Sequence, residues 1–142
     1  GTILASNILS HLLVLEGYDV KKSEIHGMSQ RGGSVISHVR YSKDKVHAPT
    51  VRLNSANLIL SFHPNETRRY AHLLKEDAII VQLQDQDKDK LPNPKSLNVY
   101  GLGLLSKHLP IQKERWVEAI KDMLKPHLQE TNLKAFELGL QA

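Results

Sequence analysis

One short segment of the chain gathers residues that could bind an anion and move a proton. Residues 23–34 combine three glycines with Arg31 and His26. Glycines let backbone N–H groups approach an anion closely, and a guanidinium can hold a carboxylate or phosphate through two parallel hydrogen bonds. An imidazole can donate or accept a proton near neutral pH. The segment therefore predicts a loop that contacts an anionic ligand; the alternative is a tight structural loop whose polar groups satisfy one another.

The candidate contact residues of this loop are Glu24, His26, Gly27, Met28, Gln30, Arg31, Gly32, Gly33 and Ser34. His26 is the one candidate for a catalytic role. His26, His38 and His47 are not spaced as a set of metal ligands, and no acidic residue joins them in a known metal pattern. We therefore expect no metal bound by this chain.

The positive charge of the protein is concentrated around the same loop. The 142 residues carry 19 Lys and Arg against 15 Asp and Glu, a net charge of +4. Residues 21–52 alone hold seven basic and two acidic residues, a net +5. Such a local field favours a phosphate-bearing cofactor, a carboxylate substrate, an acidic protein face or nucleic acid, although a solvated basic edge strand has the same composition. Aromatic residues make up only 5% of the chain, which disfavours nucleic-acid binding.

Several classes of protein are excluded or disfavoured by composition. The chain contains no cysteine, so it has no disulfide, no catalytic thiol and no cysteine-ligated iron–sulfur cluster of its own. No apolar run approaches the roughly 20 residues of a membrane span. The first residues do not resemble a secretory signal, which favours the cytoplasm.

The first third of the chain predicts the helix and second strand of a βαβ unit, followed by a hairpin of the strands 34–41 and 46–53. Apolar residues recur at helical spacing over 2–16, and Gly17 can end the helix in a left-handed conformation. A short strand over 18–22 follows, then the glycine-rich loop. A second strand is expected over 34–41, with a polar turn after it and a returning strand over 46–53.

The rest of the chain predicts a parallel crossover unit and three helices. Strands over 58–62 and 78–83 have the apolar pattern of strands buried on both faces, with a helix over 66–74 between them. Residues 84–96 are polar and predict a mobile linker or a gap in the chain. Helices follow over the ranges 98–109, 113–124 and 127–140.

Two glycines in the first of these helices carry a packing prediction. Gly101 and Gly103 would each cost a helix roughly 1 kcal/mol relative to alanine, so we expect close packing against another backbone. The length and the alternation of elements predict one α/β domain over residues 1–142, with three α/β/α layers, a mostly parallel Rossmann-like sheet and a hairpin extension. The first strand of that sheet is expected before Gly1.

Three stretches of sequence resemble one family of enzymes. They are Gly17-Tyr18-Asp19-Val20-Lys21 with the loop Ser23 to Val35 and Ser37-His38-Val39-Arg40, then Asn98-Val99-Tyr100-Gly101-Leu102-Gly103 with Leu109-Pro110, then Asn132 to Gly139. They resemble the gamma-type subunit of 2-oxoacid:ferredoxin oxidoreductases, most of all the beta subunit of the indolepyruvate enzymes. The His-Gly-Met-x-Gln-Arg-Gly-Gly-Ser-Val string is the most specific part of the match.

The sequence departs from that family in two places. Family members open with a strand and a Gly-x-Gly-Gly-Gln-Gly loop, of which only Gly1 could remain. They also carry another strand and helix between the positions of Leu83 and Asn98. The size of the sheet is therefore open.

The resemblance implies an enzyme that is complete only as a complex. The implied reaction decarboxylates a 2-oxoacid such as indolepyruvate oxidatively, passes electrons to ferredoxin and transfers the acyl group to coenzyme A. Thiamine diphosphate, Mg²⁺ and iron–sulfur clusters would lie on the large (alpha) subunit. This chain would be an auxiliary subunit bordering the active site, with its loop facing the substrate carboxylate or the coenzyme A phosphates. A stand-alone regulatory module that binds an anion or nucleotide is the alternative.

Overall fold

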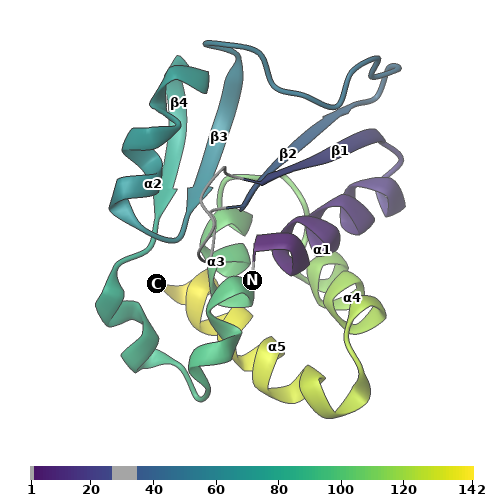
Figure 1. The fold of residues 1–142 in the computed structure, drawn as a ribbon. Coiled ribbons are helices and arrows are strands. Elements are labelled where there is room, and N and C mark those ends of the chain that lie inside the picture. Colours follow the sequence, from purple (N-terminus) through teal and green to yellow (C-terminus); the bar gives the residue numbers. More distant parts are fainter. Residues whose placement is uncertain (1, 27–34) are drawn as a thin grey trace. The chain divides into compact units, whose positions relative to one another are not determined.

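The computed structural model describes residues 2–26 and 35–142, and the chain divides into two compact units, residues 1–51 and 52–142. Each unit contains a two-stranded sheet, antiparallel in the first and parallel in the second (Figure 1). This confirms the mixed α/β class, with a parallel sheet and an antiparallel hairpin. Parallel strands do not predominate among the described residues, since each kind of pairing joins two strands. The assignment of residues 1–142 to a single domain stays a prediction.

The first unit is a helix packed against a hairpin. Helix α1 (Thr2–Leu15) buries Ile8, Leu12 and Leu13, and Gly17 follows it with a φ of 89°, as expected for a left-handed helix stop. Strands β1 (Asp19–His26) and β2 (Val35–Ser42) then pair antiparallel from Asp19–Ser42 to His26–Val35. Opposite residues share a face. The predicted helix is present, but the predicted pairing is wrong: β1 was expected in a parallel unit and β2 was expected to pair with residues 46–53, whereas the two strands pair with each other.

The first strand is longer than its sequence suggests. Residues 23–26 were expected in a loop, but they continue β1, and Ser23, Glu24 and Ile25 pair with residues of β2. Polar residues on one strand of a two-stranded sheet need not be buried, and backbone hydrogen bonds to β2 stabilise the extended conformation. The loop between the strands is therefore shorter at its start than predicted.

The predicted returning strand over 46–53 is wrong. Residues 46–51, here called the strap, form no strand and lie along one face of the hairpin. Their backbone groups bond to side chains: Val46 N–H donates to Asp19 (2.7 Å), and Arg40 donates to the Ala48 carbonyl (2.6 Å). Pro49 has no N–H group for a ladder, which fits this side-chain anchoring.

The second unit opens with the predicted parallel crossover. Strand β3 (Ala56–Ser61) pairs with β4 (Leu74–Gln82), and the connection holds α2 (Pro64–Arg69) and the 3₁₀ helix η1 (Ala71–Leu73). The prediction that β4 is buried on both faces is wrong, because Ile79 and Ile80 are 39% and 54% exposed. Among the described residues β4 has one neighbouring strand, so its other edge is open.

The polar stretch 84–96 contains two short 3₁₀ helices, η2 (Asp85–Lys90) and η3 (Pro94–Ser96). The first is held by Asp87, which is buried and accepts a hydrogen bond from the Gln84 N–H at 2.7 Å. Lys90 pairs with the same carboxylate at 3.1 Å. These contacts give the stretch a defined local conformation.

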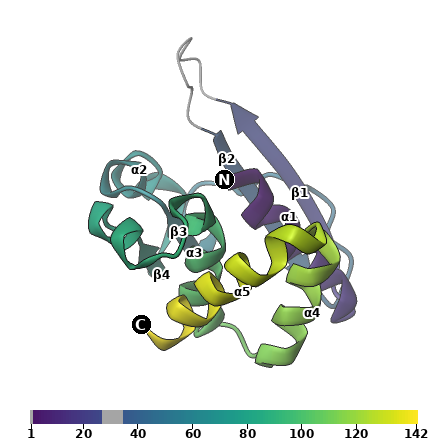
Figure 2. The same cartoon turned by 90° about the horizontal axis from the view of Figure 1, so that it is seen from below.

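Three helices complete the second unit: α3 (Leu97–Ser106), α4 (Lys113–Met123) and α5 (Pro126–Gln141). Figure 2 shows α5 running beside α3. A Cβ on Gly103 would lie 2.3 Å from the Phe136 carbonyl oxygen, and one on Gly139 would lie 2.2 Å from the Tyr100 carbonyl oxygen. The predicted backbone contact is thus confirmed at Gly103, whereas Gly101 faces the side chains of β3 and the residue after it. Trp116 stacks on Phe136 in the core.

Candidate functional site

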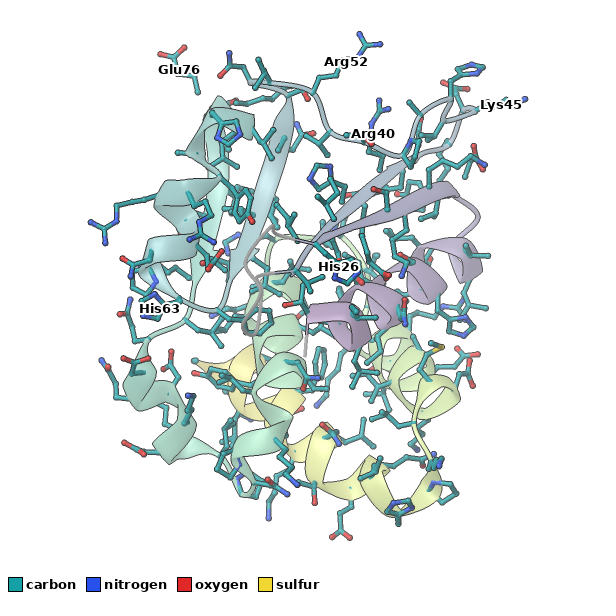
Figure 3. All side chains as sticks on the ribbon, viewed as in Figure 1. His26, Arg40, Lys45, Arg52, His63 and Glu76 are labelled. Atoms are coloured by element: carbon teal, nitrogen blue, oxygen red, sulfur yellow. The ribbon has the colours of Figure 1, made fainter. Side chains whose placement is uncertain are left out.

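The hairpin places the predicted anion loop at its end. The two strands stop at His26 and Val35, which lie opposite each other in the register. His26 is exposed there (Figure 3). The other predicted loop residues, Gly27, Met28, Gln30, Arg31, Gly32, Gly33 and Ser34, lie outside the described residues. Of the predicted contact residues, the structure therefore places only Glu24 and His26.

Glu24 takes part in a contact between the hairpin and the helix. Its carboxylate pairs with the ammonium of Lys22, two residues earlier on the same face of β1. The same ammonium donates to the side chain of Asn7 on α1. Both members of the ion pair are about one-quarter exposed on their side chains (25% for Lys22 and 27% for Glu24). Glu24 thus helps to fix β1 on α1, which sequence reasoning did not find.

The opposite face of the hairpin carries a buried histidine and the strap. His38 is 5% exposed, and its Nδ1 atom accepts a hydrogen bond from the Val51 N–H at 2.9 Å. Burial lowers the pKa of His38 from its ordinary value of 6.5. An acceptor at Nδ1 places the proton of the neutral ring on Nε2, which has no partner among the described residues.

The basic residues of this region divide into structural and exposed groups. Lys22 forms an ion pair with Glu24, and Arg40 donates a hydrogen bond to the strap. Lys43 donates to the Glu16 carbonyl at 2.7 Å and lies over the Tyr18 ring. Lys21, Lys45 and Arg52 are exposed, and Arg31 lies outside the described residues. Figure 3 labels Arg40, Lys45 and Arg52. Arg40 and Lys43 keep their charge, because their partners are neutral carbonyls, but their side chains are engaged in the fold.

Two kinds of site are not seen in the described part of the chain. No group of three or more His, Asp or Glu side chains there could hold a metal ion. None of the described helices is both long enough and apolar enough to cross a membrane.

Comparison with known proteins settles the family. Residues 1–102 match the family model described as pyruvate ferredoxin/flavodoxin oxidoreductase. The chain belongs to this family. It is therefore a subunit of an oxidoreductase of the 2-oxoacid:ferredoxin type, as the three sequence stretches predicted.

One curated relative in the family is the indolepyruvate oxidoreductase subunit IorB of Thermococcus kodakarensis. It is 32% identical over 182 aligned positions, which cover all of this chain and 90% of that protein. Since this chain has 142 residues, 40 of the aligned positions (182 minus 142) are absent from it. The short middle expected between Leu83 and Asn98 stays a prediction, because the alignment length alone does not place these positions along the chain.

Two solved structures share the fold. The gamma subunit of a keto/oxoacid ferredoxin oxidoreductase from Geobacter sulfurreducens superposes with a TM-score of 0.75 at 19% identity, over 98% of this chain and 89% of that one. A 2-oxoglutarate:ferredoxin oxidoreductase from Magnetococcus marinus, solved with 2-oxoglutarate, coenzyme A and succinyl-CoA, superposes with a TM-score of 0.77 at 16% identity. The match covers 98% of this chain but 28% of that longer chain. In that protein the fold is thus one part of a larger polypeptide.

Proposed function

We propose that this chain is the auxiliary subunit of an indolepyruvate or arylpyruvate:ferredoxin oxidoreductase. The observation that carries the proposal is the 32% identity to IorB across 90% of that protein. In the proposed reaction the bond between the carboxylate and the carbonyl carbon breaks and releases CO₂. An electron pair leaves the remaining acyl carbon for ferredoxin, and the thiol of coenzyme A forms the thioester as it loses its proton.

The proposal divides the chemistry between two subunits. Iron–sulfur clusters need ligands, usually cysteine thiolates, and this chain has no cysteine. We therefore assign the clusters to the large (alpha) subunit. The family resemblance implies that thiamine diphosphate and Mg²⁺ lie there too, with ferredoxin reached through the complex. Coenzyme A is the proposed co-substrate. The cytoplasm stays the predicted compartment.

The proposed contribution of this chain is the end of its hairpin. His26 is exposed at the end of β1, and the segment that carries Arg31 begins at the next residue. We propose that this segment borders the active site and that Arg31 binds the substrate carboxylate or a coenzyme A phosphate. His26 is the candidate for proton transfer.

Co-purification with the large subunit tests the assembly. We expect a brown complex that contains thiamine diphosphate and reduces ferredoxin when indolepyruvate and coenzyme A are both supplied. A screen of aryl and aliphatic 2-oxoacids then assigns the substrate class. A colourless monomer with high affinity for a nucleotide, and no association with the large subunit, would support the regulatory module instead.

The substitution Arg31→Ala tests the site within that complex. Loss of a charge-assisted hydrogen bond is worth about 1.5–3 kcal/mol, so KM for the 2-oxoacid or for coenzyme A should rise by roughly tenfold or more. Arg68→Ala, at an exposed position of α2, is the matched control and should leave both KM values unchanged. Unchanged kinetics for Arg31→Ala would remove this residue from the site.

A further inference from the structure

The strap is fastened to one face of the hairpin at three successive rows of the sheet. Asp19 accepts a hydrogen bond from the Val46 N–H, and Arg40 donates one to the Ala48 carbonyl. His38 accepts a hydrogen bond from the Val51 N–H. These side chains belong to the cross-strand pairs Asp19–Ser42, Lys21–Arg40 and Ser23–His38, which follow one another along the same face. The strap therefore runs along the hairpin, and His38 bonds to its last residue.

This last attachment lies at a boundary in the chain. Val51 is the final residue of the first compact unit, and Arg52 begins the second. The bond between His38 and Val51 thus fixes the backbone immediately before the second unit starts.

The attachment at His38 differs from the other two because it depends on the neutral ring. A protonated Nδ1 would be a donor facing the Val51 N–H, which is also a donor, so the hydrogen bond would be lost. The second ring nitrogen, Nε2, has no partner among the described residues that could stabilise an imidazolium. Protonation therefore removes one bond and supplies no replacement.

The charged groups on this face are two basic residues and one acid. Arg40 lies two residues from His38 on β2, and Lys21 lies opposite Arg40 on β1. Asp19, the acid of this face, is 4.0 Å from Lys21 and already accepts the Val46 N–H. The strap adds one titratable side chain, His47, which is exposed. Helix α1 packs on the other face, where Lys22 contacts Asn7.

We propose that His38 is an acid-sensitive latch that holds the end of the strap at neutral pH and releases it when its ring is protonated. The strap's far end stays attached through Asp19 and Arg40. Release therefore frees the backbone around Val51 without unfolding the hairpin.

The direction of the pH effect follows from the lowered pKa of His38. Above about 6.5, the ordinary value for histidine, the ring is neutral in both folded and unfolded chains and the latch contributes its full stability. As the pH falls from that value toward the folded-state pKa, the unfolded chain takes up the proton first and the contribution is lost. The latch itself opens as the pH falls through the folded-state pKa.

Amide hydrogen exchange in the full 142-residue chain tests the latch. Protection factors for the Val51 and Val46 amides are measured between pH 7.5 and 4.5, each corrected for the intrinsic exchange rate. We expect Val51 to lose protection by up to roughly tenfold per pH unit below the folded-state pKa, as the release of one proton-linked bond requires. Val46 should change much less over that range.

Two variants separate His38 from other groups. His38→Asn keeps an acceptor near the position of Nδ1 but does not titrate, so Val51 should stay protected at both ends of the range. His47→Asn, the matched control in the strap, should keep the wild-type pH dependence. Constant protection of Val51 in the wild type, or the same pH dependence in His38→Asn, would overturn the proposal.

Discussion

At the scale of single residues, chemical type alone does not tell a ligand contact from a fold contact. Glu24 has the charge of a catalytic or binding residue and lies next to a glycine-rich motif. Its carboxylate is nevertheless bound to Lys22, which also holds Asn7 on the helix. The link is between residues 15 positions apart in sequence, and no local pattern predicts it. The alternation of Ile36, His38 and Arg40 on one face was predictable, but not that the strap would use two of them as anchors.

The first residue-scale prediction concerns Glu24. Glu24→Gln removes the charge that neutralises Lys22, so the free energy of unfolding should fall by about 1 kcal/mol. KM for the 2-oxoacid and for coenzyme A in the assembled complex should stay unchanged. Urea unfolding of the chain and steady-state kinetics of the complex check both parts.

Glu76→Gln, at an exposed position of β4, is the matched control and should leave stability within error of the wild type. A raised KM with unchanged stability for Glu24→Gln would show instead that Glu24 contacts the ligand.

At the scale of elements, periodicity predicted the helices and the parallel crossover well. Four helices, α1, α3, α4 and α5, begin and end within three residues of their predicted bounds, because apolar spacing and the Gly and Pro stops are local signals. The helix predicted over 66–74 is wrong at its end, because α2 stops at Arg69, η1 follows and Leu74 already belongs to β4. The strap was missed because its backbone groups bond to side chains of the hairpin, which are non-local partners. The apolar run of β4 predicted burial on both faces, yet Ile79 and Ile80 are exposed. Among the described strands, β4 has β3 as its one neighbour.

The element-scale prediction tests the contact between α3 and α5. Gly103→Ala would place a Cβ 2.3 Å from the Phe136 carbonyl oxygen, which is backbone and cannot rotate away. The two helices must therefore separate, and we expect a loss of stability of at least roughly 1–3 kcal/mol, the usual cost of overpacking. Gly139→Ala should behave alike, because its Cβ would meet the Tyr100 carbonyl oxygen at 2.2 Å.

Gly101→Ala is the matched control in the same helix. Its Cβ would approach side-chain atoms of Phe62 and Leu60 at 3.3 and 3.4 Å, which can shift by a few tenths of an ångström. Alanine also favours the helix by up to roughly 1 kcal/mol, so we expect a small net change. Thermal unfolding of the three variants side by side is the measurement. Equal stability of all three would contradict the backbone contact between α3 and α5.

At the scale of the whole molecule, the sequence motifs divide into two functions. The strings around Gly103 and Gly139, which carried part of the family resemblance, form the α3–α5 crossing and serve the fold. The string around Arg31 lies outside the described residues and is the part that the proposed function uses. The uneven charge belongs with this second string, because residues 21–52 carry a net +5.

The whole-molecule prediction tests whether that field serves the reaction. Lys45→Glu with Arg52→Glu changes the charge of this region by four units at exposed positions. If the field attracts anionic coenzyme A or 2-oxoacid, KM for at least one of them should rise several-fold at low salt. The difference from the wild type should shrink at 0.5 M salt, where the screening length falls to roughly 4–5 Å.

Lys121→Glu with Lys134→Glu makes the same change of net charge at exposed positions of α4 and α5. This control separates a local field from the total charge of the molecule. If only the Lys45 and Arg52 pair raises KM, the basic segment lies close enough to the reaction to guide its anions. If both pairs raise KM equally, net charge alone explains the effect, and the concentration of basic residues between 21 and 52 has a different purpose.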